Sequence, residues 1–287
     1  MSEEIVFRHS GDIGDLLFST HFIKDIIEWR KPSKVTLALT FDKPTVRGEP
    51  HPNGAVLMNK KTVDFVMSFF KHCGLYDEVN AVDFKTFEKI IPQIPILVDL
   101  DVFRTMKLNF FATDIREYYY ALTTHHFNKD FSRNLFEGKF EGDLRAKGRV
   151  IVSYTSRVHS YYVHPHAVLF DRLDDISFIG LDSEYEEFCK IMDKKIHRFE
   201  IKTLEDAAYL IKGASGFFGN QGGLFSLAEM LKVPRLLLSP QYMVLNGRLS
   251  IGPANVNPMG GAWCDKIMVI DNSLGITKNF FDFCKGR

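Results

Sequence analysis

The first residue whose type and position could do chemistry is Asp15, which follows a short turn after an apolar run. The stretch from Ile5 to Ile27, IVFRHSGDIGDLLFSTHFIKDII, reads as a strand, a tight connection bracketed by Gly11 and Gly14, and a helix with a broad apolar face. Asp15 therefore falls in the first turn of the predicted helix. A carboxylate there complements the helix dipole, worth roughly 0.3–1 kcal/mol. In an open α/β sheet, however, the same place borders the crevice where ligands bind, and position alone leaves both interpretations open.

A second candidate is the stretch from Ser215 to Pro234, SGFFGNQGGLFSLAEMLKVP, where a predicted strand ends at Gly219 and a helix begins near Gly223. Unpaired backbone N–H groups at a helix start bind anions, so the residues between could hold a diphosphate. A plain strand-to-helix turn uses the same residue types. The stretch matches neither G-x-G-x-x-G nor G-x-x-x-x-G-K-[ST], so its spacing alone is a weak signal.

Other polar patterns are less specific. Asp99 and Asp101 form a D-x-D, which can bind a divalent cation with a diphosphate, but such short matches are common by chance and we interpret them as carboxylates at a strand end. Histidines occur in two pairs without a third ligand at suitable spacing, so a metal site is not predicted. These pairs are His125 with His126 and His164 with His166. Tyr161, Tyr162 and His164 either line a cleft, where they would stack on a base or sugar, or pack inside the protein.

Composition excludes several classes of protein. The 287 residues are 45% hydrophobic and 25% charged, as in ordinary folded proteins, and the 36 basic and 36 acidic residues give no basic excess for nucleic-acid binding. No apolar run reaches the roughly 18 residues of a membrane span. The four cysteines form no C-x-x-C pair, and the acidic N-terminus does not resemble a signal peptide, so we expect a reduced, cytoplasmic protein without a structural zinc.

The elements that must position these residues alternate between strand and helix in both halves. Strand-like runs cover 35–40, 94–100, 150–154, 176–180, 197–201, 216–219, 235–238 and 267–270, and helical patterns cover 62–73, 115–127, 184–192, 204–211, 224–231 and 277–284. A long irregular loop is predicted over 41–58, and the glycine- and charge-rich segment 138–149 is typical of a linker. We therefore predict an α/β protein with two Rossmann-like domains, 1–146 and 147–272, whose parallel sheets face a cleft, and a C-terminal helix in 273–287 that crosses back to the first domain.

Four stretches, in the right order, resemble glycosyltransferase family 9, the heptosyltransferase group of the GT-B superfamily. GDIGDLLFSTHFIKDI is similar to the opening motif of that family, and Ser153 to Arg157, SYTSR, is similar to the start of its second domain. FIGLDSEYEEF matches the family's glycine followed four residues later by a glutamate, and FFGNQGGLFSLAEMLKVPRL is similar to its donor-binding strand, loop and helix. The resemblance spans both halves but is carried by short motifs.

The resemblance implies an inverting transfer of a sugar from a nucleoside-diphosphate sugar to a hydroxyl of a glycan or glycolipid, in lipopolysaccharide or other cell-surface glycan biosynthesis. Asp15 would be the general base, Glu184 would contact the nucleoside ribose, and neither a metal nor a further cofactor would be required. A cytoplasmic protein in peripheral contact with the inner face of a membrane would fit such an acceptor. The implied donor-binding residues are Thr155, Ser156, Arg157, Glu184, Gly219, Asn220, Gln221, Gly222, Gly223 and Leu224, and the implied acceptor-side residues are Gly11, Asp12 and Gly14.

The chain departs from the family pattern at the donor loop. Where the family has Asp-Thr-Gly before its last donor helix, this chain has Asn220, Gln221, Gly222 and an additional Gly223, and Arg157 stands in for a displaced basic residue. Two alternatives therefore accompany the transferase hypothesis. One is a nucleotide-sugar epimerase of the same two-domain plan, and the other is a catalytically silent protein that binds nucleotides or glycans.

Overall fold

A computed structural model describes residues 3–45, 53–106, 115–155, 174–220, 222–238, 267–268, 282 and 284–285. The chain divides into two compact units. The first comprises Met1–Leu108, Arg116–Lys129 and Thr203–Glu205, and the second comprises Asn109–Ile115, Asp130–Lys202 and Asp206–Arg287. The domain boundaries at 146 and 272 stay predictions.

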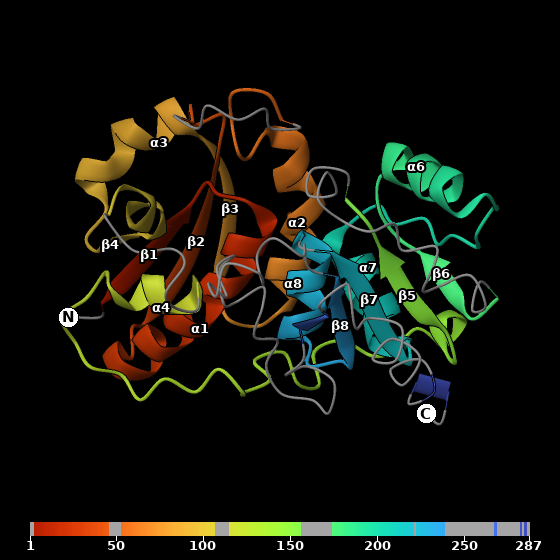
Figure 1. Cartoon of the computed structure of the whole chain (residues 1–287). Helices are drawn as coiled ribbons and strands as arrows, with labels where there is room; N and C mark the ends of the chain where they lie inside the picture. The colour runs from red at the N-terminus through yellow and green to blue at the C-terminus, as the bar shows by residue number, and fades with distance from the viewer. Residues whose placement is uncertain are drawn as a thin grey trace. The chain divides into compact units, whose positions relative to one another are not determined.

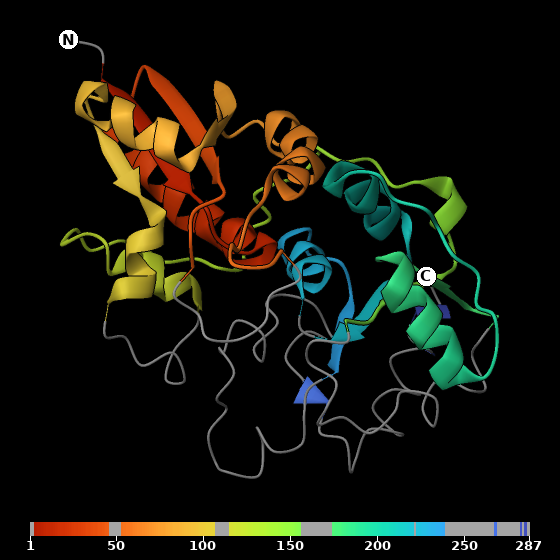
Figure 2. The same cartoon turned by 90° about the horizontal axis from the view of Figure 1, so that it is seen from above.

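The first unit contains a parallel sheet in the order β3-β2-β1-β4 (Figure 1). Its strands are β1 (Glu4–His9), β2 (Lys34–Phe41), β3 (Glu78–Asp83) and β4 (Leu97–Asp99), and its helices include α1 (Ile13–Arg30), α2 (Lys60–His72), α3 (Phe84–Ile90) and α4 (Ile115–Tyr120). The chain moves outward from β1 to β3 and then returns across β1 to form β4. Because parallel crossovers are right-handed, α1 and α3 lie on opposite faces of this sheet (Figure 2).

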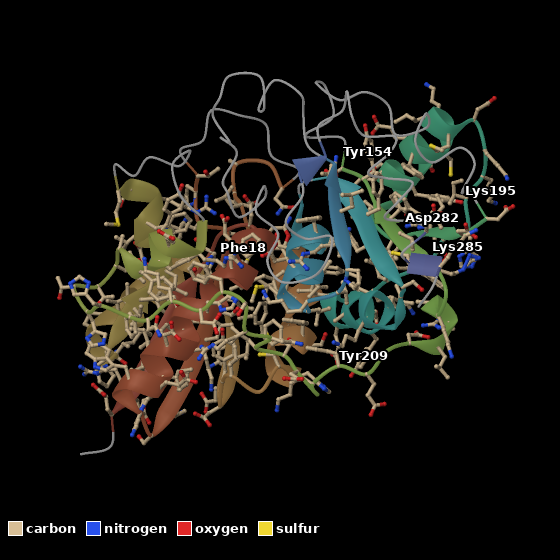
Figure 3. The ribbon with its side chains drawn as sticks, turned by 60° about the horizontal axis from the view of Figure 1, so that its bottom comes forward. Phe18, Tyr154, Lys195, Tyr209, Asp282 and Lys285 are labelled. Atoms are coloured by element: carbon tan, nitrogen blue, oxygen red, sulfur yellow. The ribbon has the colours of Figure 1, made fainter. Side chains whose placement is uncertain are left out.

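Helix α1 forms as the apolar spacing predicts, and it is buried on more than one side. Leu16, Leu17 and Phe18 are all buried, and Phe18 is labelled on this helix in Figure 3. The buried hydroxyls of Ser19 and Thr20 donate to the carbonyl groups of Leu16 and Leu17, at 2.7 and 2.6 Å, so neither polar group is left unsatisfied. The helix is therefore anchored firmly in the core, and its first turn is held at the carboxyl edge of β1.

The second unit contains a parallel sheet in the order β6-β5-β7-β8-β9. Its strands are β5 (Val150–Ser153), β6 (Ile176–Phe178), β7 (Gly216–Asn220), β8 (Arg235–Leu238) and β9 (Ile267–Met268), and its helices include α6 (Asp182–Met192), α7 (Leu204–Gly213) and α8 (Gly223–Met230). One core cluster joins β5, β6 and α6. Tyr154, labelled in Figure 3, lies just past β5, and its ring packs on that of Phe188 at 5.9 Å between ring centres. The predicted fold class, α/β with two Rossmann-like parallel sheets, is confirmed, and the cleft between the sheets stays a prediction.

Several predicted elements differ from the structure. Helix α4 ends at Tyr120 rather than at 127, because the N–H groups of Ala121 and Leu122 bond to carbonyls only three residues earlier, which tightens and ends the helix. The predicted strand over 197–201 is a single bridge between Phe178 and Arg198. Strand β3 and helix α3 were not predicted. The two ends of the predicted loop over 41–58 pair through a bridge between Pro44 and Val56, and the predicted helix over 277–284 lies largely outside the described residues.

The segment 138–149 packs more closely than its composition indicates. Phe140 and Ala146 are buried, the ring of Phe140 lies 5.7 Å from that of Tyr209 on α7, and the Asp143 N–H donates to the Tyr209 carbonyl at 2.9 Å. A side chain at Gly213 would collide with the backbone of Asp143. This segment is therefore part of the second unit's packing rather than a free linker.

In the described part of the chain, the helices are too short or too polar for any of them to cross a lipid bilayer.

Candidate functional site

The strand order of each sheet identifies one edge position where ligands bind in open α/β folds. In the first sheet the chain leaves β1 toward β2, and β4, entered from β3, lies on the other side of β1; in the second sheet the chain leaves β5 and β7 in opposite directions. A crevice opens beyond the carboxyl ends of two such strands, at the topological switch point. In the first unit this place is reached by residues 10–12 after β1 and by the short helix η2 (Leu100–Thr105) after β4. In the second unit it is reached by residues 154–155 after β5 and by the start of α8 after β7.

Asp101 is the centre of a buried polar network at the first switch point. Its side chain is 3% exposed and accepts from the Ser10 N–H at 3.0 Å, the Ser10 hydroxyl, Arg8 at 3.1 Å and the Lys43 ammonium at 2.9 Å. Burial alone would raise the pKa of Asp101, but the nearby His9 ring, Lys43 and the Ser10 hydroxyl outweigh burial and lower it to about 2. The network ties the end of β1, the end of β2 and η2 together.

Asp99 completes the pairing of the D-x-D. It accepts from Arg8 at 2.6 Å, and its other oxygen accepts from the Asp101 N–H at 3.0 Å. The Arg8 guanidinium also lies over the rings of Phe84 and Phe87, at 5.2 and 5.7 Å from their centres. Both carboxylates of the D-x-D are thus engaged by cations and backbone groups of the protein, as expected of structural carboxylates at a strand end.

A chain of hydrogen bonds runs from His9 to the backbone of Asp15. The Gly11 N–H donates to His9 Nδ1 at 2.9 Å, so the ring hydrogen sits on Nε2, which lies 3.2 Å from the Tyr119 oxygen. The Tyr119 hydroxyl then donates to the Asp15 carbonyl at 2.8 Å. Burial lowers the pKa of His9 to about 4 and raises that of Tyr119, so at neutral pH both groups are uncharged donors. The chain fixes the first turn of α1 against α4.

Asp15 itself lies in the first turn of α1, as predicted, with a side chain that is 13% exposed. Its carboxylate forms an ion pair with Arg104 at the end of η2, whose side chain is 19% exposed. Asp12 is the N-cap residue, without a side-chain capping bond, and Gly11 lies in the connection. Gly14 was predicted to bracket that connection but lies inside α1. A carboxylate at the carboxyl edge of β1 that keeps some exposure can take a proton from a bound hydroxyl.

At the second switch point, an amide joins the two strand ends. Asn220, the last residue of β7, accepts from the Thr155 N–H at 2.9 Å and donates to the Thr155 carbonyl at 2.8 Å. Both residues are buried, at 3% and 7% exposure. At Gly219, a side chain would meet the Ser153 carbonyl at 2.5 Å, so this close approach of β7 to β5 requires glycine. Asn220 therefore holds the loop after β5 to the loop after β7.

Helix α8 begins at this edge without a side-chain cap. Its N-cap residue is Gly222, which makes no capping bond, and Gly223 and Leu224 supply the next N–H groups. A Cβ at Gly222 would lie 3.6 Å from Thr155 Cγ2, so the Thr155 side chain adjoins the helix start. The Thr155 hydroxyl is buried and has no hydrogen-bond partner among the described residues. A helix N-terminus beside an unpaired buried hydroxyl is suited to an anion.

Glu184 lies in the first turn of α6, where its carboxylate accepts from the Leu181 N–H at 3.2 Å. Gly180 has φ of +150°, and a Cβ there would lie 3.1 Å from the Glu184 carboxylate, so glycine leaves room for it. Arg198 donates to the Gly180 carbonyl at 3.0 Å and lies over the Tyr185 ring. One carboxylate oxygen of Glu184 therefore caps its own helix.

Some predicted residues lie outside the described part of the chain. They are Ser156, Arg157, Tyr161, Tyr162, His164, His166 and Gln221. Of the histidine pairs, His125 and His126 are described; His126 is exposed, and His125 stacks on Trp29 at 4.1 Å between ring centres. No group of three His, Cys, Asp or Glu side chains suited to a metal ion occurs within the described ranges.

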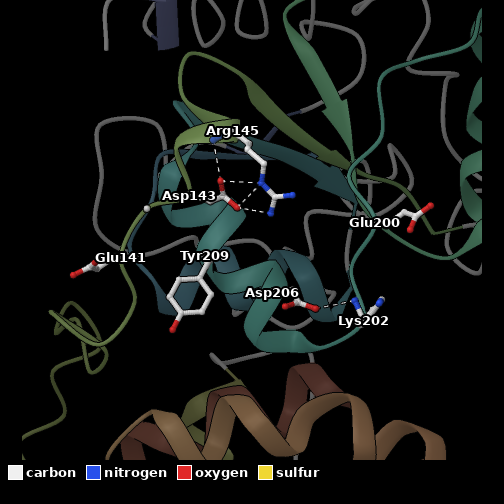
Figure 4. Close-up of a pocket in the computed structure, with 8 residues that line it drawn as sticks. Glu141, Asp143, Arg145, Glu200, Lys202, Asp206 and Tyr209 are labelled. Carbon is white, nitrogen blue, oxygen red and sulfur yellow. Dashed lines mark hydrogen bonds and ion pairs between the residues drawn. The ribbon is translucent and has the colours of Figure 1, made fainter.

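A hollow in the second unit, apart from the predicted site residues, is lined mainly by charged side chains (Figure 4). Asp143 accepts there from the Arg145 guanidinium and from the Arg145 N–H, and Asp206 accepts from the Lys202 N–H at 2.9 Å. Asp143 and Arg145 thus form an ion pair within the hollow, and Asp206 is bound by a backbone N–H. The lining residues are Glu141, Gly142, Asp143, Arg145, Glu200, Lys202, Asp206 and Tyr209, and none of them belongs to the predicted site.

Sequence reasoning missed the residues that position Asp15. The roles of His9, Asp101, Arg104 and Tyr119 depend on contacts across the sheet, which no local spacing reveals. The nearest signals were the carboxylates after the strand that ends at Asp99 and the aromatic face that includes Tyr119.

No protein-family model and no curated protein sequence matches the chain. Solved structures do match it. A glycosyl transferase family 9 structure from Veillonella parvula DSM 2008 is similar over 84% of this chain and 82% of that chain, with a TM-score of 0.54 and 13% identity. This chain has the fold of glycosyltransferase family 9 structures. The E. coli heptosyltransferase WaaC with ADP covers 82% and 86% of the two chains at a TM-score of 0.51 and 11% identity, and the E. coli ADP-heptose LPS heptosyltransferase II covers 82% and 84% at 0.50 and 12%.

Proposed function

We propose that the chain is a glycosyltransferase that moves a sugar from a nucleoside-diphosphate sugar to a hydroxyl of a glycan or glycolipid, in the manner of heptosyltransferases. The observation that carries this proposal is the pairing of two features on a shared fold. A partly exposed carboxylate, Asp15, lies at one switch point, and an uncapped helix start beside a buried, unpaired hydroxyl lies at the other.

The donor diphosphate would bind at the start of α8. The N–H groups of Gly223 and Leu224 and the Thr155 hydroxyl would donate to phosphate oxygens, and the small residues at 222 and 223 would let the phosphate approach the backbone. As the sugar–oxygen bond breaks, negative charge develops on the diphosphate, and fixed dipoles at that place lower the barrier. Gln221, Ser156 and Arg157 would complete this donor side, and the Glu184 carboxylate would accept from the nucleoside ribose.

Asp15 would act as general base. It takes the proton of the acceptor hydroxyl, the acceptor oxygen bonds to the anomeric carbon, and the nucleoside diphosphate leaves with the electron pair of the broken bond. Attack opposite the leaving group inverts the anomeric centre. Gly11, Asp12 and Gly14 would line the acceptor side. The scheme uses the nucleotide sugar as co-substrate and calls for no further cofactor, and a glycolipid acceptor would place the protein in the cytoplasm at the inner face of a membrane.

The proposal is tested by incubating the chain with ADP-, GDP-, UDP- and CDP-sugars and measuring nucleoside diphosphate release. Each donor is assayed with and without an added mixture of simple glycosides and extracted bacterial glycolipids. Release that depends on the acceptor mixture supports transfer. Release without acceptor would instead support an epimerase-like reaction, and binding of nucleotide without release would support a silent binding protein.

The donor site has its own test in Thr155→Val, which removes the hydroxyl and keeps the shape. Because the hydroxyl has no partner among the described residues, we expect the variant to be at least as stable as wild type. Its affinity for a nucleoside diphosphate should fall about tenfold or more, since hydrogen bonds to charged groups are worth about 1.5–3 kcal/mol. Calorimetric titration with ADP and UDP measures this, and Thr123→Val is the matched control because Thr123 lies in the first unit. Equal affinity of Thr155→Val and wild type would contradict the proposal that the phosphate binds at this site.

A further inference from the structure

Asp15 is held from two directions by residues that neither the motif nor the proposed reaction requires. The Tyr119 hydroxyl holds its backbone carbonyl at 2.8 Å, and the Arg104 guanidinium pairs with its carboxylate. The first contact fixes where the helix turn lies. The second contact acts directly on the atoms that would take the proton.

Arg104 is brought to this place by the buried network. It belongs to η2, whose first turn is fixed because Asp101 accepts from Ser10 and Arg8 at the end of β1. The Arg104 guanidinium lies 5.0 Å from the centre of the Phe103 ring, and that ring is buried. An arginine supported by an aromatic ring and a fixed backbone loses little further freedom when it forms an ion pair.

Gly11 provides the space that this arrangement needs. A Cβ at residue 11 would lie 2.6 Å from Arg104 Nη2, 3.3 Å from Arg104 Nε and 2.7 Å from His9 Cε1. Any larger residue would therefore push the guanidinium away from Asp15 or shift His9. The packing around residue 11 thus explains why the opening motif of this chain has glycine there.

We propose that Arg104 is the positioning residue for Asp15, and that Gly11 is glycine in order to admit it. The cation would favour the ionised form of the carboxylate and hold it in one orientation in the first turn of α1. The inference rests on the proposed function in one respect only, that Asp15 is the base. The pairing itself, and its effect on the titration of Asp15, can be measured without any substrate.

The first experiment follows the titration of Asp15 by NMR in protein labelled with 13C at the aspartate carboxyl carbons. The Asp15 signal is assigned as the one lost in Asp15→Asn. A neighbouring cation favours the ionised form of a carboxylate by about 1–3 pH units. In Arg104→Gln we therefore expect the Asp15 titration midpoint to rise by about one unit or more, and in Arg104→Lys, which keeps the charge, by less. Gly11→Ala should also raise it, because the added methyl displaces the guanidinium.

Arg30→Gln is the matched control. Arg30 pairs with Glu3 at the surface and lies at the other end of α1, so its loss should leave the Asp15 midpoint unchanged. An unchanged midpoint in Arg104→Gln, with a wild-type chemical-shift pattern elsewhere, would overturn the proposal. If Arg104→Gln does not fold, Arg104→Lys and Gly11→Ala carry the test, and equal midpoints in both and in wild type would overturn it.

The second experiment uses turnover and is separate from the first. In Arg104→Gln the acid limb of the rate profile should move to higher pH while KM for the nucleotide sugar stays unchanged, since Arg104 pairs with Asp15 in the first unit and the proposed donor residues belong to the second. A rise in KM without a shift of the acid limb would contradict a positioning role. If wild type shows no turnover with any nucleotide sugar, the proposed function fails, whereas the titration result still decides whether Arg104 acts on Asp15.

Discussion

The residues at the two switch points of this chain are held in place by different kinds of contact. At the ends of β1 and β4, four charged side chains, Arg8, Lys43, Asp99 and Asp101, neutralise one another and hold Asp15 and its partner Arg104 in place. At the ends of β5 and β7, an uncharged amide joins the strand ends through two hydrogen bonds. The first arrangement presents one carboxylate, and the second leaves backbone N–H groups and a hydroxyl available.

The difference corresponds to what each place is proposed to do. A general base needs a carboxylate of fixed position and charge, which surrounding ion pairs can supply. A site for a diphosphate needs hydrogen-bond donors without a competing carboxylate, and a neutral amide clamp preserves these. If each region depends on its own kind of contact, a substitution that breaks the contacts of one region should leave the other intact.

Asp15→Asn should remove the reactive group of the first region and leave the second intact. We expect acceptor-dependent nucleoside diphosphate release to fall about 10²- to 10⁴-fold, the usual contribution of general base catalysis. Affinity for ADP or UDP should be unchanged, because the donor site shares no residue with Asp15. A matched control is Asp25→Asn, since Asp25 lies further along α1 and pairs with Tyr120. Full activity of Asp15→Asn would contradict its role as base.

Asp101→Asn should destabilise the first unit strongly. It removes the carboxylate that pairs with Lys43 and one of the two that pair with Arg8, and breaking a buried ion pair costs about 3–5 kcal/mol. Urea unfolding measures the loss of free energy. The control is Glu78→Gln, which breaks the surface pair with Lys34 and should have far less effect, because exposed pairs contribute little. Equal effects of the two variants would show that the network is not what holds this edge together.

Acidification should act on the first region through His9. Its pKa is about 4 in the folded state and 6.5 when exposed, so the unfolded chain binds the proton more readily and stability is lost as pH falls from 6.5 toward 4. At pH 5 this single group should cost about 2 kcal/mol relative to pH 7. Asp101, with a pKa of about 2, still contributes its stability at pH 5.

The measurement is the free energy of unfolding in urea at pH 7 and pH 5, in wild type and in His9→Gln. The drop between the two pH values should be smaller by about 2 kcal/mol in the variant. His125→Gln, which replaces an exposed histidine, should leave the drop as it is in wild type. An equally large drop in His9→Gln would assign the acid sensitivity to other groups.

Asn220→Asp should weaken the second region by at least about 1 kcal/mol, because a carboxylate cannot donate to the Thr155 carbonyl and leaves it unpaired. Affinity for ADP and UDP should fall along with stability. Asn128→Asp, at an exposed position, is the control for the added charge. If Asn220→Asp kept both wild-type stability and affinity, the amide clamp would not be what organises this edge.

Much of the fold could be predicted from the sequence because its signals are local. The apolar spacing of residues 16–27 indicates a helix without information from any other part of the chain. Helix α1 lies where this spacing predicts it. The strands that end at Ser153 and Asn220 are short apolar runs bounded by glycine or polar residues, which indicate buried parallel strands. Helix α4 was predicted too long because its aromatic residues continue past Tyr120, whereas its hydrogen bonds do not.

Residues of the candidate site could be predicted only where the residue type and its place in the local sequence are enough to indicate a role. Asp15 and the glycines before α8 are of this kind. Arg104 and Asp101 are not, because their roles arise from contacts between β1 and η2, some 90 residues apart in the sequence. The segment 138–149 was interpreted as a linker from its charges, and the burial of Phe140 and Ala146 depends on α7, which lies far along the chain.

The most direct test of the account is a crystal structure of the chain with ADP or UDP bound. The account predicts that the diphosphate lies at the start of α8, with phosphate oxygens accepting from the Gly223 and Leu224 N–H groups and from the Thr155 hydroxyl, and that the ribose lies beside Glu184. A nucleotide bound anywhere else, with the α8 start and the Thr155 hydroxyl left without contact to it, would contradict the account.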